Sequence, residues 1–284
     1  MMKNFVIYIN QAYKDKTAIY ELLEELKSED HLNFYGIPEQ QDILPSDIRI
    51  LENDKTPKID CVLAFGGDGT ILRAKNIALR TKAPILGINI GYLGFLSETT
   101  LDELKSSLRN LLNKKYRLQE RMLIQCQLRR NDSIIYKGLA LNDAVACKAE
   151  MPKLIGVRIF NNRRFVFDTR CDGVIVSTPT GSTAYSLAAG GPILSPEMKA
   201  MVLSPLNPHL LTVRSMVFPS TDHLLLRIHN LESPATLQID GVNCSPIEEN
   251  DEVVITAAKQ TVQFVKLSNR TFYQILRRKL HLGK

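Results

Sequence analysis

Hydrophobic positions in the first hundred residues alternate between continuous runs and helical spacing. The runs at residues 5–10, 60–65 and 84–90 predict strands, because short continuous apolar stretches are typical of parallel strands buried on both faces. Between the runs, apolar residues recur every three or four positions, as in a helix with one buried face. These helical stretches are Ile19, Leu22, Leu23 and Leu26, then residues 71–81, then Leu101, Leu104, Leu108 and Leu111. The alternation predicts an open parallel sheet flanked by helices, an α/β domain.

The segment at residues 36–57 interrupts this alternation. It is polar and contains several prolines, so we expect a long connection or a weakly ordered region there.

After about Tyr116 the period changes from helical to strand-like. Many short runs of alternating or β-branched residues predict an all-β, largely antiparallel second domain. The runs lie at residues 122–128, 133–140, 154–160, 164–168, 174–177, 223–229, 235–239, 253–256 and 262–267. Asn161 and Asn162 suit a hairpin tip, because asparagine tolerates positive φ.

The last segment returns to a helical period. Residues 271–280 predict a helix with Phe272, Ile275, Leu276 and Lys279 on one face, so we expect the chain to return to the first domain. The predicted domains are therefore residues 1–100, completed by 270–284, and a β-rich domain at 101–269.

Composition limits the class of protein. With 44% hydrophobic and 23% charged residues, the 284-residue chain is typical of a folded globular protein. No apolar run approaches the ~20 residues that span a bilayer, and the first residues lack a secretory signal, so we expect a cytoplasmic protein with no membrane partner. Five scattered cysteines without a Cys-x-x-Cys pair, and five dispersed histidines, favour reduced thiols and no fixed metal site.

The net charge of +6 favours an anionic partner. Lysine and arginine are spread along the chain rather than gathered in a basic arm, so a small molecule bearing several phosphates fits as well as nucleic acid.

The strongest local motif is Gly66-Gly67-Asp68-Gly69-Thr70, between a predicted buried strand and a helix. The free amides and positive dipole at a helix N-terminus favour phosphate, and Gly66, Gly67 and Gly69 let the backbone approach it. A carboxylate in such a turn is electrostatically costly unless it orients a metal ion or takes a proton from an attacking hydroxyl. The alternative is a turn whose Asp68 merely caps the helix. The motif is neither a Walker A sequence nor a dinucleotide fingerprint.

A second motif runs from Asp172 to Ser186, where a strand leads into a turn rich in hydroxyls that ends near Tyr185. Such a segment can offer several hydrogen bonds and an aromatic face to a flat base. Taken alone, it could also be an ordinary Ser/Thr-rich loop.

Both motifs resemble known families. The glycine-rich turn is similar to the signature shared by NAD kinases, diacylglycerol and sphingosine kinases and, in related form, 6-phosphofructokinases. The run from Asp172 to Ser186 resembles the long signature of NAD kinases, which the other kinases lack. Residues 87–96 and Leu141-Asn142-Asp143 are similar to further NAD kinase segments, and the resemblance extends from about Phe5 to Leu280.

The resemblance implies roles position by position. Asp68 would accept the proton of the adenosine-ribose 2′-hydroxyl of NAD during attack on the γ-phosphate of ATP, and Gly66, Gly67, Gly69 and Thr70 would form the phosphate loop. The residues implied to bind NAD are Asp68, Gly69, Arg73, Asn142, Asp143, Lys153, Arg170, Asp172, Thr180, Thr183, Ala184, Tyr185, Ser186 and Ala188.

Three positions depart from the family pattern. Ala188 stands where many members have serine, a loss of one hydroxyl contact worth about 1 kcal/mol. Val242 follows Asp240-Gly241 where a polar residue is common, and Asp143 is the shorter of the two acids found at its position. These changes bear on affinity more than on activity.

The resemblance also implies cofactors and partners. We expect Mg²⁺, or another divalent cation, to arrive with ATP, and NAD and ATP to be the substrates, with polyphosphate retained as an alternative donor and no nucleic acid partner. Edge strands of the β-rich domain would be covered in a homodimer or homotetramer. Two other functions stay open at this point, a lipid kinase with the same glycine-rich turn and a non-catalytic NADP-binding regulator.

Overall fold

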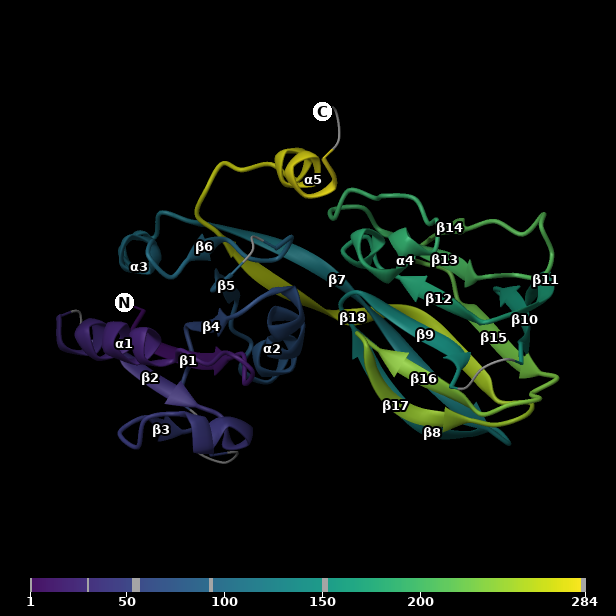
Figure 1. The fold of residues 1–284 in the computed structure, drawn as a ribbon, viewed down its shortest axis with the longest axis horizontal. Helices are drawn as coiled ribbons and strands as arrows, with labels where there is room; N and C mark the ends of the chain where they lie inside the picture. The colour runs from purple at the N-terminus through teal and green to yellow at the C-terminus, as the bar shows by residue number, and fades with distance from the viewer. Residues whose placement is uncertain (1, 30, 53–56, 92–93, 150–152, 282–284) are drawn as a thin grey trace. The chain divides into compact units, whose positions relative to one another are not determined.

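The chain folds into two compact units in the computed structural model, which describes residues 2–29, 31–52, 57–91, 94–149 and 153–281 (Figure 1). Unit 1 comprises residues 1–120 and 262–284, and unit 2 comprises residues 121–261. The α/β and all-β architectures of the two units confirm the predicted fold class. The first boundary lies at residue 120 rather than the expected 100 because helix α3 (Leu104–Leu112) packs into the core of unit 1, and the second lies at 261 rather than 269 because Val265 packs into that core as well.

Unit 1 is built on a parallel sheet with the strand order β5-β4-β1-β2-β3. Its strands are β1 (Asn4–Ile9), β2 (Asn33–Gly36), β3 (Arg49–Ile50), β4 (Cys61–Phe65) and β5 (Ile85–Asn89), with the short β6 (Thr99–Thr100) beside β5. The strands β1, β4 and β5 are the three predicted from continuous apolar runs. Every residue of β4 and β5 is buried, as expected for central parallel strands.

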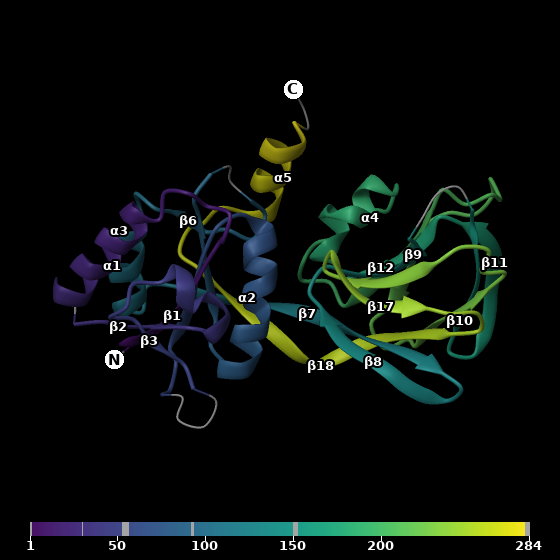
Figure 2. The ribbon, with the colours of Figure 1, turned by 60° about the horizontal axis from the view of Figure 1, so that its bottom comes forward.

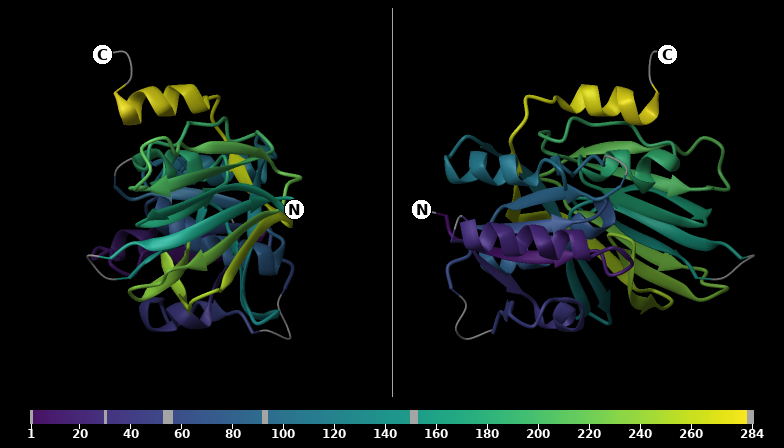
Figure 3. Two further views of the ribbon diagram at one scale, coloured as in Figure 1. Left: turned by 90° about the vertical axis from the view of Figure 1, so that its right-hand side faces the viewer. Right: turned by 60° about the vertical axis from the view of Figure 1, so that its left-hand side comes forward.

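Helices cover both faces of this sheet (Figure 2). Helix α1 (Thr17–Glu29) and α3 pack on one face through the leucines and isoleucine that the helical spacing predicted. Figure 3, in its right-hand view, shows α1 lying along that face. Helix α2 (Asp68–Thr81) packs on the other, where a Cβ at Gly87 of β5 would lie 2.6 Å from the Ile71 Cδ1 atom. Glycine at this position therefore sets how closely α2 approaches the sheet.

The segment at residues 36–57 was predicted to be weakly ordered, and this prediction is wrong for its described part. It contains the 3₁₀ helix η1 (Pro38–Ile43) and strand β3. The buried Gln40 side chain accepts a hydrogen bond from the Ile9 amide (2.9 Å) and donates one to the Ile9 carbonyl (2.5 Å). A buried polar side chain thus fixes this segment to β1. The hydrophobic pattern of the sequence does not reveal such an attachment.

The C-terminal helix α5 (Phe272–Leu280) confirms the predicted final helix. Thr271 and Gln274 form a reciprocal capping box at its start, which satisfies two otherwise free amides. The Phe272 ring lies 6.5 Å from the Phe95 ring, and α5 belongs to unit 1 as expected.

Unit 2 contains two antiparallel sheets that enclose one core. One has the strand order β14-β13-β12-β9-β16-β17. Its strands show the usual twist of a β-sheet (Figure 3, left). The other contains β11, β10, β15, β18, β7 and β8. Alternate residues of both sheets point into the core, for example Val174 and Val176 from β12 and Ile155 and Val157 from β10.

The strands of unit 2 were predicted only in part. Those present are β7 (Arg117–Arg130), β8 (Ser133–Ala140), β9 (Asp143–Lys148), β10 (Ile155–Asn161), β11 (Arg164–Cys171), β12 (Gly173–Ser177), β13 (Ala200–Leu206), β14 (Met216–Pro219), β15 (Leu224–His229), β16 (Ala235–Ile239), β17 (Val242–Ile247) and β18 (Glu252–Lys266). The two runs predicted at 253–256 and 262–267 are one strand, β18. Strands β9, β13, β14 and β17 were missed, two of them because Pro205 and Pro246 lie within the strand and argue against it.

Candidate active site

The glycine-rich turn lies at the carboxyl end of β4 and starts helix α2. Gly67 is the N-cap residue, with no side-chain cap, and Asp68 is the first helical residue. Asp68 therefore does not cap α2, which excludes the hypothesis that capping is its role.

The Asp68 carboxylate is held by the loop that follows β5. Its Oδ2 atom accepts a hydrogen bond from the Phe95 amide (2.8 Å), and its Oδ1 atom accepts one from the Leu96 amide (3.0 Å). A Cβ at Gly94 would lie 1.9 Å from Oδ1, so the loop can approach the carboxylate only with glycine there. The two hydrogen bonds orient the Asp68 carboxylate. Because each carboxylate oxygen has two lone pairs, Asp68 can still accept a proton.

The backbone around Asp68 is open to a ligand. Gly67 and Gly69 are exposed, and a Cβ added at either would meet no atom within 4 Å. Among the described residues, no backbone acceptor takes the Asp68 or Gly69 amide, as is usual at a helix N-terminus. Gly66 is different, because a Cβ there would lie 2.4 Å from the Oγ1 atom of the buried Thr70. Gly66 and Thr70 thus shape the turn, whereas Gly67 and Gly69 leave room above it for phosphate.

Arg73 lies one turn along α2 from this loop and is exposed. It hydrogen-bonds to the phenol of Tyr8 on β1; burial raises the Tyr8 pKa, and Arg73 partly offsets that rise. The arginine is thereby kept near the glycine-rich turn, and its contact with phosphate stays a prediction.

In unit 2, Asn142 and Asp143 lie where the chain enters β9. The Thr178 amide donates to the Asn142 carbonyl (2.8 Å), and the Thr178 hydroxyl donates to the Leu141 carbonyl (2.5 Å). The Gly181 amide in turn donates to the Thr178 hydroxyl (3.1 Å). These bonds join the two segments that the family resemblance singled out, although 30 to 40 residues separate them in the sequence.

Replacing Gly181 with alanine tests this junction. The new methyl group would lie 2.2 Å from the Asn142 carbonyl oxygen and 2.5 Å from its carbon, so the backbone bearing Asn142 must move. We expect the KM for NAD to rise at least about 10-fold, because displacements near 1 Å at a binding residue are costly, while the KM for ATP changes little. Steady-state kinetics with each substrate varied in turn would check this, and an unchanged KM for NAD would contradict it.

Asp143 is a buried carboxyl group, and its surroundings favour the protonated form. Burial, together with the neighbouring Asp240 carboxylate, raises the pKa of Asp143 to about 7. A carboxyl with a raised pKa in the folded state binds its proton more tightly than it does in the unfolded chain. Its contribution to stability therefore falls as pH rises from about 4 to about 7.

The hydroxyl-rich segment separates into structural and available groups. Ser182 is fully buried, and its hydroxyl accepts the Leu194 amide (3.0 Å). Ser186 is also fully buried, with its hydroxyl 3.0 Å from that of Ser204. Thr180 differs, because its buried hydroxyl has no partner among the described residues. The Thr183 hydroxyl donates to the Thr180 carbonyl (3.3 Å), so within this segment the predicted ligand contact of Thr180 fits this division better than those of Thr183 and Ser186.

Tyr185 begins the short helix α4 (Tyr185–Ala188) and is about half exposed. Burial raises its pKa, with further contributions from Cys147, Asp172 and Asp143. The ring therefore lies within electrostatic reach of two predicted ligand-binding carboxyl groups. Ala184 is partly buried and Ala188 is exposed, so both are available on the same short stretch.

The remaining predicted residues already have partners or stand apart. Asp172 accepts from Asn207 (2.8 Å) and pairs with Lys148 (2.5 Å); together these outweigh the effect of burial and lower its pKa. Arg170 pairs with Glu232 (3.0 Å) in an exposed position. Lys153 is exposed. Tyr92 and Leu93, in the family segment at 87–96, lie outside the described residues.

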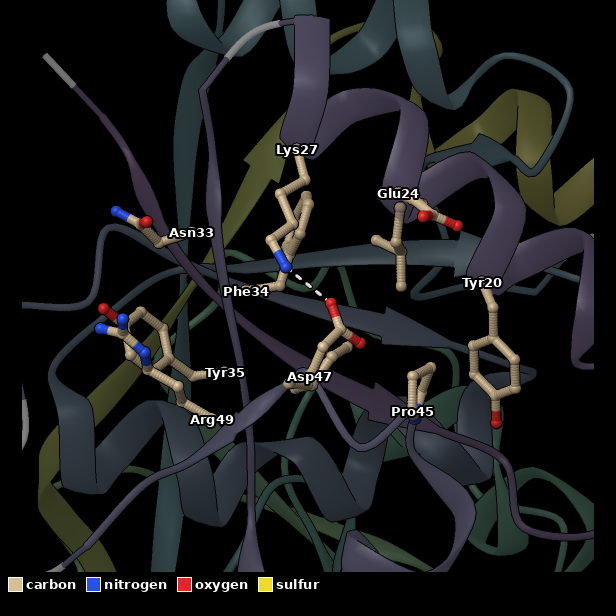
Figure 4. Close-up of a pocket in the computed structure, with 11 residues that line it drawn as sticks. Tyr20, Glu24, Lys27, Asn33, Phe34, Tyr35, Pro45, Asp47 and Arg49 are labelled. Atoms are coloured by element: carbon tan, nitrogen blue, oxygen red, sulfur yellow. Dashed lines mark hydrogen bonds and ion pairs between the residues drawn. The ribbon is translucent and has the colours of Figure 1, made fainter.

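A separate pocket in unit 1 contains none of the predicted site residues among those that line it (Figure 4). Its volume is about 230 Å³, and α1, β2 and the segment before β3 form its walls. The Lys27 ammonium and the Asp47 carboxylate pair across it at 2.6 Å, where Figure 4 draws them together. Two of its charged groups therefore satisfy each other.

In the described ranges, no group of three or more His, Cys, Asp or Glu side chains is placed to hold a metal ion. Of the helices that the structure describes, none is long and apolar enough to cross a bilayer.

A parallel sheet that leads through a carboxylate-bearing glycine turn into the start of a helix marks a protein that binds phosphate groups. Residues 9–116 match the family described as the ATP-NAD kinase N-terminal domain, and residues 141–267 match the ATP-NAD kinase C-terminal domain. The chain belongs to the NAD kinase family.

Individual relatives agree. An NAD kinase of Carboxydothermus hydrogenoformans is 40% identical over 228 residues, covering 80% of this chain and 81% of the relative. One from Lachnoclostridium phytofermentans is 34% identical over 286 residues, covering 98% and 99%. Among solved structures, yeast NADH kinase complexed with NADH superposes with a TM-score of 0.88 at 24% identity, covering all of this chain and 88% of that one. An NAD kinase from Archaeoglobus fulgidus in complex with ATP gives 0.72 at 23% identity, covering 99% of each. These two structures support the fold.

Proposed function

We propose that this protein transfers the γ-phosphate of ATP to the adenosine-ribose 2′-hydroxyl of NAD, giving NADP and ADP. The observation that carries the proposal is Asp68: an oriented carboxylate between two exposed glycines, in a turn where the Asp68 and Gly69 amides have no backbone acceptor among the described residues. Membership of the NAD kinase family selects the reaction.

In this proposal each part of the chain has a simple task. The turn from Gly66 to Thr70 receives phosphate groups at the start of α2. Asp68 accepts the proton of the 2′-hydroxyl as the ribose oxygen forms its bond to the γ-phosphorus and the bond to the ADP oxygen breaks. Positioning and charge neutralisation supply most of the acceleration in phosphoryl transfer.

Residues of unit 2 bind the dinucleotide. Asn142, with a partly exposed side chain, and Asp143 hydrogen-bond to it, Arg170 lies near its phosphates, and Asp172 accepts from a polar edge. The base and ribose contacts come from Thr180, Thr183, Ala184, Tyr185 and Ala188, while the fully buried Ser186, with its hydroxyl 3.0 Å from that of Ser204, holds this segment in place. Gly69, Arg73 and Lys153 complete the phosphate contacts.

The divalent cation fits the chemistry of the turn. Mg²⁺ usually travels with substrate phosphates rather than in an all-protein cage, so the ion would arrive on the triphosphate that the turn receives. The ion, when bound, neutralises charge on the triphosphate.

We expect the protein in the cytoplasm, and its β-rich unit supports a homo-oligomeric assembly. In the described structure, β14 pairs only with β13, and its Met216 and Val217 are exposed, as are Leu210 and Leu211 a few residues earlier in the chain. An apolar edge strand of this kind favours pairing with a second copy, as a homodimer or homotetramer. The lipid kinase and the non-catalytic regulator are not supported by the relatives.

A donor and acceptor panel tests the proposal. Purified protein incubated with γ-labelled ATP and Mg²⁺ should transfer label to NAD and none to diacylglycerol; NADH and polyphosphate would be run in parallel to define the substrate range. Tight binding of NAD by calorimetry without any label transfer would refute the enzyme assignment and favour a binding protein.

A further inference from the structure

The turn between β16 and β17 places a carboxylate against a segment nearly a hundred residues away in sequence. The turn has two residues, Asp240 and Gly241, with φ values of +49° and +77°. Two-residue hairpins of this type need positive φ at both positions, and Asp-Gly is among the pairs that adopt it most readily. Turn geometry accounts for the residue types, but it does not account for where the Asp240 side chain goes.

Three consecutive amides donate to that side chain. The Leu141 amide reaches Oδ2 at 3.0 Å, and the Asn142 and Asp143 amides reach Oδ1 at 2.7 and 3.2 Å. In return, the Asp240 amide donates to the Asp143 carbonyl at 2.9 Å. Hydrogen bonds to an ionised carboxylate are roughly twice as strong as bonds between neutral groups, so the Asp240 carboxylate holds the backbone of residues 141–143 firmly in place.

The same segment is held from its other side. Thr178 donates from its amide and its hydroxyl to the carbonyls of Asn142 and Leu141, as described above. The backbone of residues 141–143 is thus fixed through its amides by Asp240 and through its carbonyls by Thr178. The Asn142 side chain, which is partly exposed, makes no side-chain hydrogen bond within the described part of the chain and is left for a ligand.

We propose that Asp240 is a positioning residue for the dinucleotide: its carboxylate fixes the backbone that aims Asn142 and Asp143 at NAD. This proposal rests on the proposed function, in which those two residues contact the substrate. Asp240 itself acts through them.

The charge of Asp240 gives this role a measurable signature. The titratable groups acting on Asp143 from neighbouring elements are Asp240 on the hairpin and Tyr185 on α4, while β12 places Ser177 opposite it. Burial and the Asp240 charge raise the Asp143 pKa, and the raised pKa of Tyr185 keeps the phenol neutral at working pH. Removing the Asp240 charge should therefore lower the pKa of Asp143.

The first experiment compares Asp240→Asn with wild type across pH 5.5 to 9. Asparagine keeps the side-chain size but can accept at only one atom, so at least one amide loses its partner. Loss of a hydrogen bond to a charged group predicts a KM for NAD raised about 10-fold or more, with the KM for ATP nearly unchanged. The pH inflection of kcat/KM for NAD should move to lower pH.

Two further variants separate positioning from stability. Asp222 accepts from Asn161 (2.8 Å) and Asn162 (3.0 Å) at a different hairpin of unit 2, so Asp222→Asn is a matched loss of a loop-holding carboxylate. It should leave the KM for NAD and the pH profile unchanged. Asp143→Asn keeps the backbone bonds to Asp240 and should abolish the inflection near pH 7 whether or not Asp240→Asn yields folded protein.

The outcomes are distinct. Two outcomes would overturn the positioning role alone, provided that the wild-type protein is active. One is a KM for NAD and a pH profile in Asp240→Asn that equal those of the wild type. The other is an inflection near pH 7 that persists in Asp143→Asn. A wild-type protein that transfers no phosphate to NAD overturns the proposed function and the positioning role with it.

Discussion

Replacing Asp68 with asparagine is expected to reduce kcat by about 10² to 10⁴-fold, the usual contribution of a positioned general base. Asparagine has nearly the same shape but cannot take the proton of the attacking hydroxyl. The asparagine NH₂ group would replace one of the two oxygens that accept the Phe95 and Leu96 amides. Two donors would then face each other, so the loop after β5 should loosen slightly. The rate of label transfer from ATP to NAD measures the first effect, and calorimetry with NAD should show binding largely retained.

Asp102 provides the matched control for this variant, because it is an exposed carboxylate of the same unit. Asp102→Asn removes the same charge from unit 1 and should keep wild-type kcat. If Asp68→Asn retained a kcat close to that of Asp102→Asn, Asp68 could not be the proton acceptor.

The positions of the main motifs could be predicted from the sequence because they depend on local pattern. A run of five buried residues, Cys61–Phe65, followed by glycines and a helical period, fixes the turn at the carboxyl end of a parallel strand. The C-terminal helix was equally predictable, since its apolar face and its Thr271 cap are both local signals.

The contacts that give those motifs their roles are not local, and the pattern could not reveal them. The orientation of the Asp68 carboxylate is set by amides 27 and 28 residues further on. Ser186 could be expected to touch a ligand because nothing in its own neighbourhood predicts Ser204 as a partner. Asp240 was noticed only as part of a family motif, and its grip on residues 141–143 appears only when β16 pairs with β9.

Strands were missed where burial and polarity disagree with the usual pattern. Strand β17 is largely exposed and contains Pro246, so it lacks both alternation and the expected residue types. Strand β9 begins at Asp143, a buried acidic residue, and an acidic residue at that position makes the start of the strand resemble a turn.

The Glu98→Gln variant is expected to lose about 3 kcal/mol of the free energy of unfolding. The Glu98 side chain is almost fully buried, pairs with the Lys266 ammonium, and accepts the Leu267 and Ser268 amides at 2.9 and 2.7 Å. Removing its charge leaves the mostly buried ammonium of Lys266 without compensation, a change that typically costs about 3–5 kcal/mol when both partners are fully buried. Urea denaturation would measure the loss.

Glu25 supplies the matched control, because it pairs with Lys105 in the same unit but with both side chains well exposed. Glu25→Gln should cost less than about 1 kcal/mol, as surface ion pairs usually do. Glu98 also fixes the segment that leads into α5, whose Phe272 lies against Phe95, the residue whose amide holds Asp68. We therefore expect kcat to fall in Glu98→Gln while the KM for NAD, set by unit 2, stays close to wild type. Equal and small losses of stability in the two variants would show that the buried pair does not anchor the C-terminal segment.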